Sequence, residues 1–148
     1  MREPARISFV NKLTIDRPPA AVFAYLVDLE NLPRWNYAIS DTRKVTTGPV
    51  GVGTRYRQSR TIPARTHESL EVTELDPDRR LAVSGSLNAL PAKISYELRP
   101  EGTATVLTNT IELRPSGLLS LLAPIATREI KSAVAANLQI LKQILERA

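Results

Sequence analysis

The middle of the chain constrains the fold most, because it divides into short segments in which apolar and polar residues alternate. From Ala38 to Leu113 these segments are separated by residues that favour turns. The turns are predicted at Gly48-Pro49, Gly53, Pro63, Asp76-Pro77-Asp78, Asn88 to Pro91, and Pro100 to Gly102. The pattern predicts six strands. Parallel neighbours need crossovers of about a dozen residues, so strands joined by such short turns form an antiparallel sheet.

A further strand and two short helices are predicted before this region. Residues 7 to 15 alternate, and their apolar face carries Ile7, Phe9, Leu13 and Ile15, with Asn11 on the same face. A helix is predicted from Pro19 to Val27, because proline is tolerated in a first helical turn. Asn31 to Pro33 ends this helix or begins a second short one.

The last segment predicts one long amphipathic helix from Ile125 to Arg147, about 34 Å long. Its apolar stripe consists of Ile130, Val134, Leu138, Leu141 and Leu145. The predicted fold is therefore α+β: a seven-stranded curved antiparallel sheet around a long C-terminal helix, with two short helices after the first strand. One helix covers only part of such a sheet, so we expect an internal cavity between them.

The composition is typical of one globular domain, which we expect to span residues 1–148. Apolar residues make up 43% of the chain, charged residues make up 24%, and there is no cysteine. The net charge is +5, but Lys and Arg are scattered, so no nucleic-acid partner is predicted. The longest apolar stretch, Gly117 to Ala126, contains Pro124 and is too short to span a membrane. We predict no stable membrane insertion and, without a signal-peptide pattern, a cytoplasmic location.

Motifs along almost the entire chain follow one another in a known order and spacing. They are Ile15 to Phe23, Val27-Asp28, Leu32 to Trp35, Val50 to Tyr56, Glu71 to Leu81, Gly102 to Val106, and Asn137 to Lys142. In these motifs the chain resembles the START-like (SRPBCC) superfamily, in particular its polyketide cyclase/dehydrase and lipid-transport branch. The resemblance implies a helix-grip fold around a ligand cavity. It does not imply catalysis, because none of these motifs is a catalytic signature.

Most cofactor chemistry is excluded by the residue types present. His67 is the only histidine, and no Gly-x-Ser-x-Gly elbow accompanies it, so neither a catalytic triad nor a multi-histidine metal site is predicted. The glycines Gly48, Gly51 and Gly53 precede no predicted helix, so they form no phosphate-binding loop. We therefore predict no metal and no cofactor.

Several polar residues share otherwise apolar faces and are candidates for lining the cavity. Glu68 alternates with Leu70 and Val72, Asn109 with Leu107 and Ile111, and Tyr96 with Ile94 and Leu98, whereas Asn137 accompanies Val134 on the last helix. A buried unpaired polar group costs about 1 to 3 kcal/mol, so each needs a partner, water or a ligand. The alternative is that Asn11, Asn109 and Asn137 bond one another or the backbone in the core.

The remaining candidates are one acid, two arginines and a tryptophan. Glu68 is a candidate general acid or base, or it pairs with an arginine and only shapes the pocket. The segment that contains Arg55, Arg57 and Arg60 carries charge on both faces, so it turns an arginine inward or is a solvated edge strand. Trp35 lies at the cavity mouth or in the core. The predicted ligand-binding residues are Trp35, Arg55, Arg57, Glu68, Tyr96, Asn109, Val134 and Asn137.

Three functions fit these observations. The first is binding of a hydrophobic or amphipathic small molecule, such as a lipid, a polyketide or an aromatic metabolite. The second is a cofactor-independent cyclase or dehydratase in which Glu68 or Tyr96 transfers protons. The third is a protein-interaction module that uses an exposed apolar patch at Leu118 to Leu122. The slightly longer segment from Gly117 to Ala123 could form a lid, an ordinary helix turn or a homodimer contact.

Overall fold

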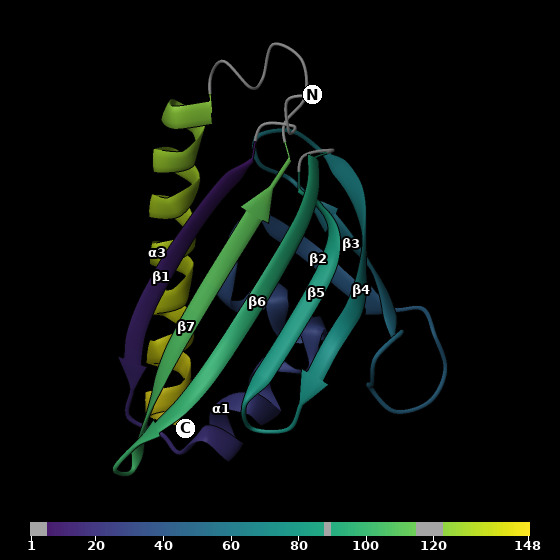
Figure 1. Ribbon diagram of the computed structural model, residues 1–148. Coiled ribbons are helices and arrows are strands. Elements are labelled where there is room, and N and C mark those ends of the chain that lie inside the picture. Colours follow the sequence, from purple (N-terminus) through teal and green to yellow (C-terminus); the bar gives the residue numbers. More distant parts are fainter. Residues whose placement is uncertain (1–5, 88–89, 115–122) are drawn as a thin grey trace, which may run out of the picture.

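One antiparallel sheet of seven strands forms the framework of the molecule, in the order β1-β7-β6-β5-β4-β3-β2 (Figure 1). The computed structural model describes residues 6–87, 90–114 and 123–148. The strands are β1 (Ile7–Ile15), β2 (Ile39–Lys44), β3 (Arg55–Arg60), β4 (Thr66–Asp76), β5 (Arg80–Leu87), β6 (Leu90–Glu101) and β7 (Ala104–Leu113). The predicted six strands after Ala38 and the predicted antiparallel sheet are confirmed.

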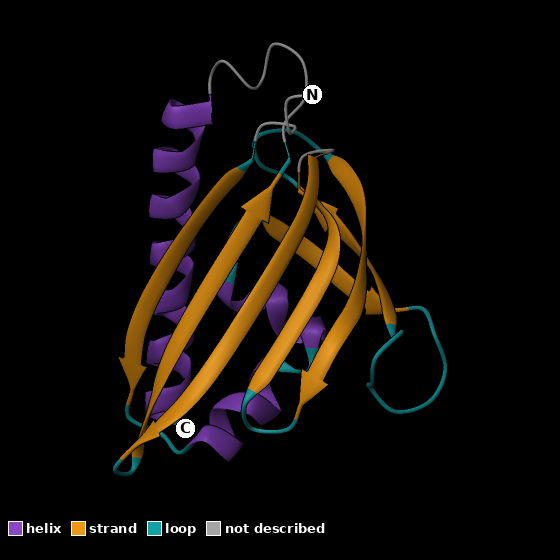
Figure 2. Ribbon diagram, in the orientation of Figure 1, coloured by secondary structure: helices purple, strands orange, loops and turns teal. Residues whose placement is uncertain are grey.

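The helices lie behind the sheet and at its lower end in the view of Figure 2, where β1 crosses in front of the long helix. They are α1 (Pro19–Leu26), the short 3-10 helix η1 (Leu29–Asn31), α2 (Leu32–Trp35) and α3 (Ala123–Arg147). The predicted α+β helix-grip fold is confirmed. Within the described residues, no helix combines the length and the apolar character that a membrane crossing requires.

Two helix boundaries differ slightly from the prediction. The first helix ends at Leu26, and Val27 caps it. The last helix begins at Ala123, two residues before the predicted start, so Pro124 lies in its first turn, where the missing N–H of proline is not needed. The predicted lid or contact segment at Leu118 to Leu122 lies outside the described residues.

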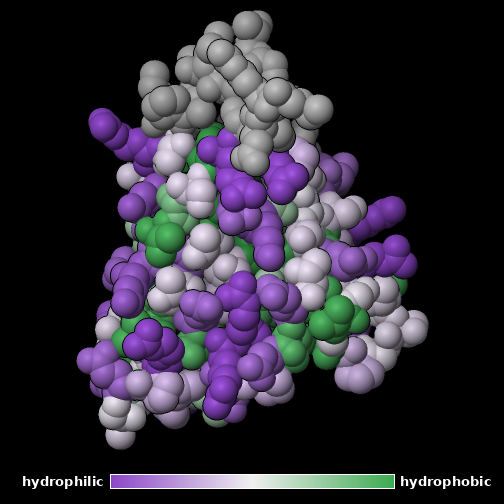
Figure 3. Space-filling view, in the orientation of Figure 1, coloured by the Kyte–Doolittle hydropathy of each residue, from purple (hydrophilic) through white to green (hydrophobic). Residues whose placement is uncertain are grey.

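Alternation along the strands divides the sheet into an inner and an outer face. On β7 the side chains of Leu107, Asn109, Ile111 and Leu113 are buried, and the residues between them are less so. The opposite face carries ion pairs such as Arg80 with Glu74 and Glu97. Figure 3, which looks onto this outer face, shows that hydrophilic side chains predominate there. The core therefore lies between the inner face and the helices.

The C-terminal end of α3 is hydrogen-bonded to the residues that directly follow β1. The backbone N–H of Asp16 donates to Glu146 Oε2 at 2.7 Å, and Arg17 Nη1 donates to the carbonyl of Ala148 at 2.8 Å. The hydrogen bond from Asp16 and, next, that from Lys142 lower the pKa of Glu146. These contacts hold one end of the helix against the sheet, so the cavity forms toward its other end.

Candidate functional site

A cavity of about 460 Å³ lies between the inner face of the sheet, α2 and the first half of α3. Most of its wall is apolar. The apolar lining includes Leu29, Leu32, Trp35, Ile39, Leu70, Val83, Ile94, Ile111, Leu113, Ile130, Val134 and Leu138. A volume of this size is within the usual range for small-molecule sites, about 300 to 1,000 Å³. The structure therefore has a pocket of ligand size between the sheet and the helices.

Two aromatic rings form one end of the pocket. Trp35 at the end of α2 meets Tyr96 of β6 edge to face, with ring centroids 6.4 Å apart and an interplanar angle of 77°. Both side chains are buried, at 5% and 7% exposure. Burial raises the pKa of Tyr96, so its phenol stays protonated at neutral pH. Tyr96 can therefore donate a hydrogen bond but is a poor base.

A buried trio of polar side chains stands on β3 and β4. Arg60 Nε donates to Glu68 Oε2 at 3.0 Å, and Gln58 Nε2 donates to Glu68 Oε1 at 2.7 Å. Gln58 and Arg60 line the pocket, whereas Glu68 lies behind them and is 3% exposed. The strand register explains this grouping, because Gln58 faces Glu68 directly across the β3–β4 pair. The carboxylate thus neutralises the arginine and holds both side chains in place.

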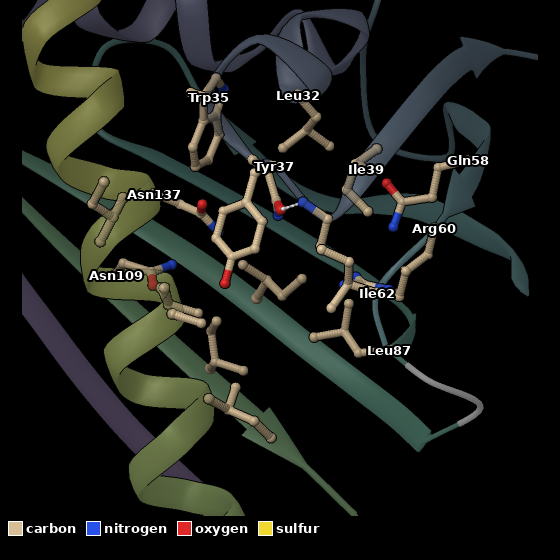
Figure 4. A pocket seen from close by; sticks show the side chains of 18 of the residues that line it. Leu32, Trp35, Tyr37, Ile39, Gln58, Arg60, Ile62, Leu87, Asn109 and Asn137 are labelled. Carbon is tan, nitrogen blue, oxygen red and sulfur yellow. Dashed lines mark hydrogen bonds between the residues drawn. The ribbon is translucent and has the colours of Figure 1, made fainter. Parts of the chain in front are cut away.

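Two amides form the opposite wall of the pocket. Asn109 of β7 and Asn137 of α3 lie on the side of α3 in Figure 4, across the pocket from Gln58 and Arg60. Asn109 Nδ2 donates to the carbonyl of Ser95 at 3.1 Å. Among the described residues, neither Asn109 Oδ1 nor Asn137 Oδ1 has a hydrogen-bond partner, although both are buried. Such oxygens need water or a ligand.

The alternative was that the asparagines bond one another or the backbone, and for Asn109 and Asn11 the structure shows the backbone form of it. Asn109 bonds the backbone of Ser95, as above, and Asn11 Nδ2 donates to the carbonyl of Lys131 at 3.4 Å. Asn11 and Asn109 are direct neighbours across the β1–β7 pair. Only Asn109 of these two lines the pocket, because Asn11 turns toward the backbone of α3.

The structure brings five of the eight predicted ligand-binding residues together. Trp35, Tyr96, Asn109, Val134 and Asn137 line the pocket. The sixth, Glu68, lies behind the wall and orients Gln58 and Arg60 by accepting their hydrogen bonds.

Arg55 and Arg57 are the two predicted residues that the structure places elsewhere. Both are exposed on the outer face, since Tyr56, Gln58 and Arg60 are the residues of β3 that turn inward. The inward arginine is therefore Arg60. Alternation along this strand could have identified Gln58 and Arg60, because they follow Tyr56 at successive intervals of two residues and so share its face.

Two residues at the mouth of the pocket, Tyr37 and Ile62, were not predicted. Tyr37 and Ile62 line the pocket and are nevertheless 56% and 47% exposed. Figure 4 shows Tyr37 between the amides and Arg60. Large apolar side chains that are half exposed beside a cavity indicate where a ligand can enter. Both lie on connections between elements, where sequence periodicity carries no information.

Two buried tyrosines make stability depend on alkaline pH. Burial, with smaller contributions from the negative charges of Asp28 and Glu30, raises the pKa of Tyr56 from 10.0 to about 12. Between pH 10.0 and about 12 the Tyr56 phenol loses its proton in the unfolded chain but keeps it in the folded chain. The free energy of unfolding therefore falls as pH rises through this range. Tyr96 acts in the same direction. We expect urea unfolding of Tyr56→Phe to depend less steeply on pH there, whereas the exposed Tyr37→Phe keeps the steeper dependence.

A metal centre is not supported by the part of the chain that the structure describes, where no group of three or more metal-ligating His, Cys, Asp or Glu side chains occurs. The polar side chains that line the pocket are the amides of Asn36, Gln58, Asn109 and Asn137, the guanidinium of Arg60, the phenols of Tyr37 and Tyr96, and the carboxylate of Glu129. This set can form hydrogen bonds and transfer a proton. It suits an organic ligand better than an ion.

Comparison with protein families gives a match over nearly the whole chain. The family described as polyketide cyclase / dehydrase and lipid transport matches residues 6–146. The chain matches no curated protein at a significant level.

Solved structures share the fold at low sequence identity. TTHA0849 from Thermus thermophilus aligns with a TM-score of 0.78 at 19% identity, over 93% of this chain and 96% of that one. The Zhui aromatase/cyclase from a Streptomyces species aligns with a TM-score of 0.75 at 17% identity, over 96% and 94%. The two-domain aromatase/cyclase StfQ of the steffimycin biosynthetic pathway aligns with a TM-score of 0.79 at 14% identity, over 97% of this chain and 51% of that one. At sequence identities this low, the similarity supports a shared fold only.

Proposed function

Since the chain belongs to the polyketide cyclase / dehydrase and lipid transport family of the START-like superfamily, we propose that it binds a largely apolar small molecule between the sheet and α3. The observation that carries the proposal is the cavity of about 460 Å³ with its apolar wall. Burial of apolar ligand surface there contributes roughly 25 cal/mol per Å². The half-exposed Tyr37 and Ile62 mark the entrance.

The proposal is tested first on the protein purified from its own host. Native mass spectrometry followed by organic extraction should detect a stoichiometric small molecule. The emptied protein should then bind a hydrophobic fluorescent dye, and the signal of Trp35, the single tryptophan, should change because this residue lines the pocket. An empty protein that also leaves the dye unbound would overturn the proposal.

Filling the pocket from α3 should weaken binding. Ala133 lines the cavity, whereas Ala136 of the same helix is exposed. In Ala133→Phe the added ring occupies space that a ligand needs, so we expect the Kd of the dye to rise by about tenfold or more, equivalent to about 1.4 kcal/mol. Ala136→Phe adds the same ring to the surface and should bind as the unaltered protein does. Titration of both variants by fluorescence measures the difference, and equal dissociation constants would contradict this location of the site.

A cofactor-independent cyclase is the second candidate. It is favoured by the position of two proton-bearing groups, Tyr96 and Arg60, on the pocket wall, and by the aromatase/cyclases among the similar folds. Glu68 is less suited to act as the base, because both its oxygens accept hydrogen bonds behind the wall. A cyclisation assay with a linear polycarbonyl compound distinguishes the candidates. Catalysis predicts turnover that Tyr96→Phe removes while the dye still binds; a carrier shows no turnover.

A further inference from the structure

Two pairs of buried polar side chains stand on opposite walls of the cavity and differ in hydrogen-bonding character. We call Gln58 and Arg60 the β3 wall, and Asn109 and Asn137 the amide wall. Figure 4 shows the two walls on either side of the pocket. All four side chains line the pocket, and none is more than 9% exposed. A ligand that extends across the cavity therefore meets both walls.

The β3 wall offers hydrogen-bond donors without a net charge. Arg60 has no acceptor atom, and only one of its five N–H donors, the one on Nε, is used in the hydrogen bond to Glu68 Oε2. The ion pair with Glu68 at 3.0 Å cancels the positive charge. Gln58 Nε2 also donates to Glu68, whereas Gln58 Oε1 is buried and has no hydrogen-bond partner among the described residues. The β3 wall therefore offers a ligand the N–H donors of Arg60 together with one amide acceptor, Gln58 Oε1.

The amide wall offers acceptors. Asn109 Nδ2 donates to the carbonyl of Ser95, and the reversed amide would place two oxygens against each other, so the orientation of Asn109 is fixed. Its Oδ1 is 99% buried with the rest of the side chain and has no partner among the residues described. Asn137 Oδ1 on α3 is also buried without a hydrogen-bond partner among the described residues. An oxygen of this kind can only accept a hydrogen bond.

We infer that the cavity takes a neutral, largely apolar molecule with a carbonyl-type acceptor at the end that meets Arg60 and a hydroxyl or N–H donor at the end that meets Asn109 and Asn137. This inference rests on the proposed function and adds to it the polarity and the direction of the ligand. A carboxylate is disfavoured at both walls: Glu68 already neutralises Arg60, and the amide oxygens repel an anion. A purely apolar molecule leaves buried polar atoms unpaired.

Matched naphthalenes test the inference with the unaltered protein. The reference compound carries an acetyl group and a hydroxyl group at opposite ends. Its three analogues lack the hydroxyl, carry ethyl in place of acetyl, or carry carboxylate in place of acetyl. We expect the reference to bind about tenfold more tightly than each neutral analogue, since each loses one hydrogen bond to a buried partner, and the carboxylate to bind more weakly still. The change in Trp35 fluorescence or calorimetry measures each Kd.

A variant then assigns the hydroxyl to the amide wall. Asn109→Leu removes the acceptor at similar volume, so the preference for the hydroxylated compound should fall from about tenfold to none, while acetylnaphthalene keeps its Kd within about twofold. Asn11→Leu is the matched control, because Asn11 is the cross-strand neighbour of Asn109 and does not line the pocket. It should retain the preference. The series with the unaltered protein remains decisive if Asn109→Leu does not fold.

The outcomes separate this inference from the proposed function. Equal binding of the hydroxylated and the unhydroxylated compound, or tightest binding of the carboxylate, would overturn the inference and leave the apolar binding site intact. Failure of every naphthalene and of the hydrophobic dye would overturn both. A preference that Asn11→Leu removes and Asn109→Leu retains would also refute the assignment of the donor to the amide wall.

Discussion

Replacement of Glu68 by leucine is expected to lower the free energy of unfolding by about 3 to 5 kcal/mol. The carboxylate is 1% exposed and the Arg60 side chain 10%, so the ion pair between them is shielded from water. Leucine fills the space but leaves the guanidinium buried without its counter-charge, and it removes the acceptor for Gln58 Nε2. Urea denaturation, with stability extrapolated to water, measures the loss.

Two controls separate the buried charge from the general cost of a substitution on β4. In the double variant Glu68→Leu, Arg60→Met, no charge remains at the site, so most of the lost stability should return. Glu74 lies on the same strand as Glu68, and its ion pairs with Arg80 and Lys93 are on the surface. Glu74→Leu breaks these pairs and should lower the free energy of unfolding by about 1 kcal/mol or less. If Glu68→Leu cost no more than Glu74→Leu, Arg60 would not depend on Glu68 in the way the geometry indicates.

The fold could be predicted from the sequence because its main determinants are periodic and local. The alternation in residues 7 to 15 placed Ile7, Phe9 and Ile15 on the buried face, where the structure has them. The stripe from Ile130 to Leu145 predicted α3, and its later positions Leu138, Leu141 and Leu145 are buried. The turn residues divided the sheet at the right places. Each of these signals depends on neighbours within a few positions in the chain.

The site was predictable only in part, because it depends on which residues face one another across strands. Asn109 and Tyr96 were found since each interrupts an apolar alternation, and they are cross-strand neighbours. Pairing of Glu68 with an arginine was one of the predicted alternatives, but neither Arg60 nor Gln58 was identified as the partner. The partners are set by the β3–β4 register, which places Gln58 opposite Glu68 and Arg60 two residues along. The alternation within one strand carries no information about how that strand is aligned with its neighbour. Similarly, the position of Tyr37 follows from the path of a connection, not from a pattern.

The two walls also explain why a cavity persists in a well-packed domain. The inward polar groups on β3 and β7 cannot be covered by apolar side chains without losing their hydration, so the space between them must hold water or a ligand. Their charges are already balanced, because Glu68 neutralises Arg60. The cavity therefore has buried polar groups on two facing walls and a largely apolar lining elsewhere.

Substitution of Gly85 by alanine is the second change with a large expected effect. Gly85 lies on β5 directly opposite Leu70 of β4. A Cβ atom at Gly85 would lie 2.2 Å from the carbonyl oxygen of Ser69 and 2.7 Å from Leu70 Cδ2. The first of these contacts is with backbone, so the two strands must move apart, and overpacking of this kind costs about 1 to 3 kcal/mol. We expect a loss of about 2 to 3 kcal/mol and a fall in Tm of roughly 5 to 10 °C.

Gly51→Ala is the matched control for Gly85→Ala, because a Cβ at Gly51 meets no atom within 4 Å. Alanine there also reduces the conformational freedom of the unfolded chain, so stability should stay within about 0.5 kcal/mol or rise slightly. Gly85→Ala should also affect the pocket, because Leu70, which the new Cβ atom would contact, lies in the pocket wall. Displacement of Leu70 in Gly85→Ala should therefore weaken dye binding together with stability. A Gly85→Ala protein as stable as Gly51→Ala would show that β4 and β5 are less closely packed than the structure indicates.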